Sequence, residues 1–73
     1  MLELDVRPIL RAGGEPFDQI MTFVSSLPAG EGFRLYATFR PDPLLQVLKT
    51  KGYRGEAEEL PDGDWVVHFY PMD

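Results

Sequence analysis

Arginine side chains gather in two loops that follow the first two predicted strands of this chain. Arg7 and Arg11 lie in the loop 7–15, and Arg40 lies in the loop 39–42. The predicted fold places these loops side by side, at the sheet edge where open α/β proteins bind ligands. Each loop leads into a predicted helix start, where free backbone N–H groups and a partial positive charge favour an anion. The pattern predicts a pocket for phosphate, sulfate or a carboxylate.

Two glycines and an aspartate complete this predicted site. Gly13 and Gly14 would let the backbone approach a ligand closely, because glycine has no side chain. Asp42 precedes a proline and is expected to be the N-cap of the second helix. The predicted anion site therefore comprises Arg7, Arg11, Gly13, Gly14, Arg40 and Asp42.

A purely structural interpretation of the same residues stays open. In that interpretation Arg7 pairs with Asp5 or Glu15, Arg11 is solvated, and the glycines only form the turn. A contact with another protein is the third alternative.

Hydrophobic periodicity predicts the elements that position these loops. Strands are expected at 2–6, 33–38, 53–60 and 65–70, and helices begin at Pro16 and Asp42. Right-handed crossovers would place both helices on one face of a mixed four-stranded sheet. The sequence predicts one domain over residues 1–73, an α/β (α+β) two-layer sandwich in the order βαβαββ.

The face of the sheet opposite the helices is the second candidate site. Alternation along the strands places these side chains on it: Arg34, Tyr36, Thr38, Val66, His68 and Tyr70. Exposed aromatic residues favour docking of a protein partner or a second copy of the chain. The alternative is an ordinary solvated face with cross-strand aromatic pairs.

Composition excludes several kinds of site. The chain has no cysteine and one histidine, His68, so it has neither a disulfide nor a thiolate or histidine-rich metal site. The acidic residues around 56–64 lack the spacing of a calcium loop and are expected to be a solvated, edge-protecting run. We therefore expect no cofactor and no metal.

The charge of the chain restricts its partners and location. A formal net charge of −5 disfavours nonspecific binding to nucleic acid or to an anionic membrane. The first residues lack the pattern of a secretory signal, and no stretch has the ~20 apolar residues of a membrane span. The chain is expected in the cytoplasm.

Five short segments carry a resemblance to a known family. They are Leu4-Asp5-Val6-Arg7-Pro8, Gly14-Glu15-Pro16-Phe17, Leu27-Pro28-Ala29-Gly30-Glu31, Phe39-Arg40-Pro41-Asp42-Pro43-Leu44 and Gly63-Asp64-Trp65-Val66-Val67. In this order they resemble the TusA/SirA-like sulfur-carrier domains, through an uncharacterised bacterial relative of TusA. The resemblance implies a TusA-like fold, a bacterial origin and a role near sulfur, redox or nitrogen-oxide metabolism.

The chemistry of TusA proteins does not carry over. These proteins hold a persulfide on a cysteine at the start of the first helix, in a Cys-Pro-x-Pro motif. When Pro16 is aligned with the second proline, Gly13 occupies the cysteine position. Cysteine-based sulfur transfer is thereby excluded, and the prediction is a non-catalytic binding or interaction domain. The alternatives are a noncovalent carrier of an anion or sulfur compound at the helix N-termini, and a structural, homo-oligomerising subunit.

Overall fold

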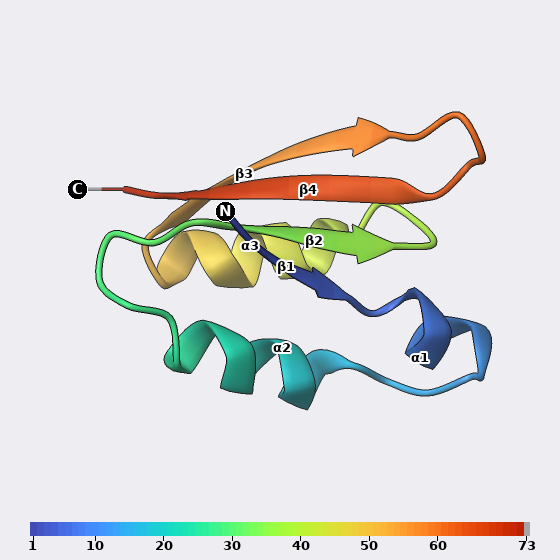
Figure 1. The fold of residues 1–73 in the computed structure, drawn as a ribbon, viewed down its shortest axis with the longest axis horizontal. Helices are drawn as coiled ribbons and strands as arrows, with labels where there is room; N and C mark the ends of the chain where they lie inside the picture. Colours follow the sequence, from blue (N-terminus) through green and yellow to red (C-terminus); the bar gives the residue numbers. More distant parts are fainter. Residues whose placement is uncertain (73) are drawn as a thin grey trace.

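Two layers, a sheet and a set of helices, make up the computed structural model, which describes residues 1–72 (Figure 1). The elements in chain order are β1 (Leu2–Asp5), α1 (Arg7–Arg11), α2 (Phe17–Ser25), β2 (Phe33–Ala37), α3 (Asp42–Thr50), β3 (Tyr53–Glu59) and β4 (Trp65–Pro71). The predicted two-layer α/β class and mixed four-stranded sheet are confirmed.

The sheet has the strand order β1-β2-β4-β3. β1 runs parallel to β2, and Leu4 lies opposite Leu35. β4 is antiparallel to both β2 and β3, so the last two strands form a hairpin. The one parallel pair brings the carboxyl ends of β1 and β2 to the same edge, from which α1 and α3 lead away.

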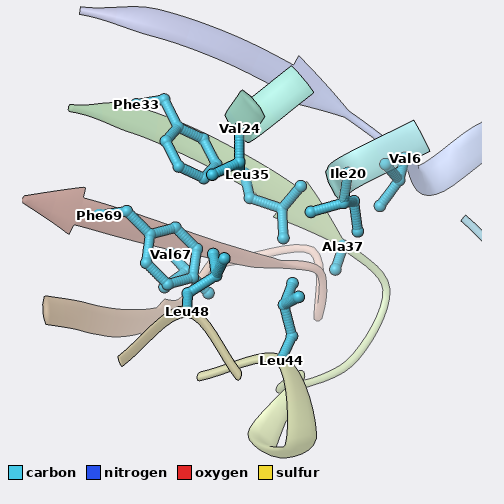
Figure 2. Close-up of a cluster of buried hydrophobic side chains, with 10 residues drawn as sticks. All are labelled: Val6, Ile20, Val24, Phe33, Leu35, Ala37, Leu44, Leu48, Val67 and Phe69. Atoms are coloured by element: carbon cyan, nitrogen blue, oxygen red, sulfur yellow. The ribbon is translucent and has the colours of Figure 1, made fainter. Parts of the chain in front are cut away.

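The core lies between the sheet and the two longer helices. Period-two alternation turns Phe33 and Leu35 of β2 and Phe69 of β4 toward this layer, and all three are fully buried. The rings of Phe33 and Phe69 stack with centroids 4.9 Å apart. Figure 2 shows the ten residues of the core, with Val6, Ile20, Ala37 and Leu44 at one end of the cluster and the two phenylalanines at the other.

One helix of the structure was not predicted. The segment 7–15 was expected to be a loop, but Arg7–Arg11 forms the short helix α1 with Pro8 in its first turn. Proline fits there because its fixed φ suits a helix and its missing N–H has no acceptor in the first turn. Leu10 packs against the core from this helix. The element order is therefore βααβαββ.

The predicted start of α2 needs correction by one residue. Pro16 is the N-cap of α2, which begins at Phe17. The expectation that Asp42 caps α3 was wrong, because Pro41 is the N-cap and Asp42 already belongs to the helix. Gly52 follows α3 with a φ of 92°, a left-handed conformation typical of glycine after a helix. Among residues 1–72, no helix has the length and apolar character needed to cross a bilayer.

Candidate functional site

An apolar pocket of about 220 Å³ opens at the carboxyl edge of β1 and β2, between the starts of α2 and α3. Leu35 and Ala37 of β2 contribute to its wall, together with Ile20 of α2 and Leu44 of α3. Glu15 is the single charged residue among those that line it. Figure 2 shows the end of the core at which this pocket lies. The site therefore suits apolar groups.

Two exposed phenylalanines belong to this pocket. Phe17 at the start of α2 is 40% exposed, and Phe39 in the loop after β2 is 51% exposed. Large aromatic side chains are enriched in the central contacts of protein interfaces, where they contribute most of the binding energy. Their exposure next to an apolar pocket gives a surface suited to contact with another molecule.

Carboxylates of the chain itself lie at the two helix starts. Both oxygens of Glu15 accept a hydrogen bond from the Phe17 N–H, at 2.9 and 3.0 Å. Asp42 lies in the first turn of α3, where a negative charge interacts favourably with the helix dipole. An external anion at either end would have to compete with these resident charges.

Arg7 and Arg11 meet on the carboxylate of Asp64. The nearest oxygen of Asp64 lies 3.2 Å from Arg7 and 2.7 Å from Arg11. Asp64 is only 8% exposed, and it belongs to the turn between β3 and β4. The cluster joins α1 to this turn, and Figure 1 shows both at the same end of the sheet.

Arg7 also holds Asp5 at the end of β1. Its side chain donates hydrogen bonds of 2.9 and 2.8 Å to the two carboxylate oxygens. These hydrogen bonds lower the pKa of Asp5 below its usual range, against a smaller opposing effect of desolvation. The same contacts raise the pKa of the Arg7 guanidinium, so both groups stay charged near neutral pH.

The remaining residues of the predicted anion site do not join the arginine pair. Arg40 makes an ion pair of 2.8 Å with Asp42, and both side chains are largely exposed. Gly13 has a φ of 82°, which explains why glycine is required at this turn, and Gly14 is exposed next to it. The structure therefore brings Arg7 and Arg11 together but pairs Arg40 separately. Anion binding at this edge stays a prediction.

The open face of the sheet is covered by charged and aromatic side chains in contact with one another. Arg34 pairs with Glu3 at 2.9 Å, and the Tyr36 hydroxyl donates to the same carboxylate at 3.2 Å. The guanidinium of Arg7 lies 5.0 Å from the centre of the Tyr36 ring. Val66 lies between Tyr36 and Glu58 in the sheet register.

The second half of this face follows the same pattern. Arg54 lies 5.0 Å from the Tyr70 ring centre and 3.5 Å from Glu56. His68 approaches Glu58 at 3.5 Å. The predicted surface residues thus share one face, but Val66 is 4% exposed and the others are half-buried: Arg34, Tyr36, His68 and Tyr70.

The apolar pocket was not predicted from the sequence. Analysis of the two loops concentrated on arginines and glycines, whereas the pocket is lined by Pro16, Pro41 and Pro43 and by two phenylalanines. A signal was present in the sequence, since Phe17 directly follows Pro16 and Phe39 is separated from Pro41 by one residue. In residues 1–72 no group of three or more His, Cys, Asp or Glu is placed to hold a metal ion.

The fold and the pocket define a small two-layer α/β domain with an apolar site at the carboxyl edge of its sheet. A family model described as an uncharacterized conserved protein, DUF2249, matches residues 3–71. The chain belongs to the DUF2249 family. No curated protein and no solved structure matches the sequence significantly.

Proposed function

We propose that this domain is a non-catalytic binding module whose apolar pocket receives a bulky apolar side chain of a partner protein. The observation that carries the proposal is the pocket between the starts of α2 and α3, with Phe17 and Phe39 exposed beside it. Ligand sites in open α/β sheets lie at this edge. The pocket and the two phenylalanines together form the proposed contact surface.

The size of the pocket favours a side chain over a small-molecule ligand. Its volume of about 220 Å³ lies below the range of roughly 300–1,000 Å³ in which small-molecule and cofactor sites fall. A protein anchor needs less room, because the surrounding exposed surface supplies the rest of the contact. This comparison supports a protein partner.

The chemistry of the lining supports a binding role without catalysis. Glu15 is its only charged side chain, and that carboxylate accepts hydrogen bonds from the Phe17 N–H. A general acid or base needs a proton to transfer within hydrogen-bond reach and a pKa suited to the task. No serine, threonine, cysteine, lysine, histidine or tyrosine lines the pocket.

The acidic residues around the pocket define the other half of the partner. Glu15 and Asp18 lie at the start of α2, and Asp42 lies at the start of α3, where Arg40 balances one of these charges. Basic residues beside the apolar anchor would complement this rim and speed association. A partner segment with a leucine or phenylalanine flanked by lysine or arginine fits the site best.

The open sheet face is less suited to be the primary contact. Its charged groups are already paired within the chain, as in Arg34–Glu3 and Arg54–Glu56. A partner would have to replace these contacts and desolvate charged groups, which costs free energy. We therefore assign the primary contact to the pocket, in a domain that we also propose to be TusA-like and cytoplasmic.

Blocked amino acids provide a direct test of the pocket. Amide NMR of the labelled protein would be followed during titration with N-acetyl-phenylalaninamide, N-acetyl-leucinamide and N-acetyl-lysinamide. We expect saturable shifts around Phe17, Ala37 and Phe39 with the first two compounds and none with the lysine compound. Equal shifts with all three would contradict the proposal.

Variants at the pocket give the matched comparison. Phe39→Ser removes an exposed ring and should weaken binding of both apolar compounds without unfolding the domain. Ala37→Leu should abolish the shifts by filling the pocket from its buried wall. Met72→Ser, also an exposed apolar residue but outside the pocket, is the control and should bind as the wild type does. Unchanged binding in Phe39→Ser and Ala37→Leu would overturn the assignment.

A further inference from the structure

The two edges of the sheet differ in how open they are to another strand. The order β1-β2-β4-β3 leaves β1 and β3 at the edges. β3 carries four charged residues, Arg54, Glu56, Glu58 and Glu59, and such edges discourage strand pairing between molecules. β1 is the shorter edge strand. Its first residue, Leu2, and the preceding Met1 are exposed apolar residues.

The hydrogen-bonding pattern shows which backbone groups of β1 face outward. The Val6 N–H donates to the Tyr36 carbonyl at 3.1 Å, and Asp5 lies opposite Tyr36 in the register. In a parallel ladder the groups that face the neighbour belong to alternate residues. The N–H and C=O groups of Glu3 and Asp5 therefore point away from β2, toward the free edge.

A groove continues this edge into the helical layer. It is shallow and open to solvent, and it is lined by Leu4 of β1 and by Asp18, Gln19, Thr22 and Phe23 of α2. A strand added beside β1 would cover this groove and direct every second side chain into it. The outward backbone groups require an extended chain, because a helix satisfies its own N–H and C=O groups.

The charged residues near the β1 edge indicate what kind of chain could pair with this strand. Glu3 and Asp5 lie on the open-face side of β1, where they are already paired with Arg34 and Arg7, whereas Asp18 beside the groove makes no ion pair among residues 1–72. A basic segment would complement the carboxylate of Asp18. The net charge of −5 opposes approach of a second copy.

We propose that β1 accepts an added strand from a basic partner protein, whose alternating apolar residues enter the groove beside Asp18. The edge supplies backbone hydrogen bonds and the groove supplies specificity. This surface is separate from the proposed pocket, since the two sites lie on different flanks of α2 and share no lining residue.

A synthetic peptide of alternating lysine and valine tests the inference. In an amide NMR titration we expect saturable shifts at Glu3, Asp5 and Phe23, with cross-strand nuclear Overhauser effects between the peptide and β1. Two matched control peptides have the same sequence with every second backbone nitrogen methylated. In one peptide the methylated residues are the odd-numbered ones, and in the other they are the even-numbered ones; these are the two phases. At least one phase should lose binding about tenfold or more, since it lacks the donors that face β1.

Two variants of the protein complete the test. Thr22→Lys places a cation in the groove and should weaken peptide binding about tenfold, whereas Gln46→Lys on the exposed face of α3 should change it less than about twofold. Glu3→Pro removes one outward N–H and keeps the β1–β2 ladder, so it should also weaken peptide binding. Phe39→Ser, which disrupts only the pocket, should leave the peptide affinity unchanged.

Three results would overturn the inference. They are shifts confined to β3, equal binding of both methylated peptides and the parent peptide, and equal affinity for the Thr22→Lys and wild-type proteins. None of these results depends on whether the pocket binds the blocked amino acids.

Discussion

The two nine-residue helices contact the sheet in different ways. α3 lies close against β3, where a Cβ built on Gly55 would overlap the end of the Leu45 side chain and come within 2.9 Å of the Phe69 ring. α2 packs its buried residues Ile20 and Val24 on the sheet, with the groove on one flank and, on the other, the pocket that it shares with the start of α3. Figure 1 shows α2 beyond β1.

This difference places both proposed binding surfaces beside α2, although α2 also contributes Ile20 and Val24 to the core. Close packing gains dispersion and hydrophobic free energy, and spaces beside a helix forfeit some of both. In a chain of 73 residues little stability is in reserve. Keeping both spaces around α2 is consistent with a binding role for that side of the molecule.

The largest expected effect is loss of a core side chain from α3. Leu48 is fully buried, and Leu48→Ala should lower the free energy of unfolding by about 2–5 kcal/mol. Met21→Ala on α2 should cost less than half as much, because Met21 is only half-buried. Urea unfolding of both variants measures the difference. Equal losses would show that burial of the side chain does not set the cost at these two positions.

Overlap at Gly55 should give the next largest effect. Gly55→Ala adds a methyl group where Leu45 and Phe69 already lie, and overpacking of this kind costs about 1–3 kcal/mol. In a Leu45→Ala background the overlap is partly relieved, so the same substitution should cost less. A double-mutant cycle measured by urea unfolding checks this. Additive losses would show that Leu45 is not the obstacle.

The ion-pair cluster of Arg7, Arg11 and Asp64 links α1 to the turn between β3 and β4. Asp64→Asn removes the charge that Arg7 and Arg11 share, and we expect a loss of about 1–2 kcal/mol because both arginines keep access to water. Hydrogen exchange should also accelerate in α1 more than in β4. Glu59→Gln is the control, since Glu59 makes no ion pair among residues 1–72. Matching exchange rates in Asp64→Asn and Glu59→Gln would contradict the proposed link.

The fold could be predicted from the sequence because its elements have clear periodicity. Alternating residues from Phe33 to Ala37 and the apolar stripe through Ile20 and Val24 correspond to buried positions in the structure. The short helix α1 was missed because five residues with a proline carry too little periodic signal. Its stability comes from tertiary contacts, such as Leu10 on the core and Arg11 on Asp64.

The candidate site was harder to predict because it depends on distant residues. Asp64 lies 57 residues from Arg7, and no local pattern indicates that it would neutralise the arginine cluster. Phe39 could be recognised as apolar, but its exposure follows from where the loop passes the helix starts. Spaces between packed elements depend on the distance between them, which periodicity does not fix.

The smallest expected effect is the pH dependence of the Asp5–Arg7 pair. The Arg7 hydrogen bonds lower the pKa of Asp5 in the folded state, so its ionised form stabilises the fold above the unfolded pKa of about 3.9. This contribution is lost as the pH falls through the lower folded-state pKa. Asp5→Asn should therefore lower the urea midpoint slightly at pH 7 and approach the wild type as the pH falls below the folded-state pKa of Asp5. A difference that does not shrink with falling pH would trace the effect to geometry at the end of β1, and not to charge.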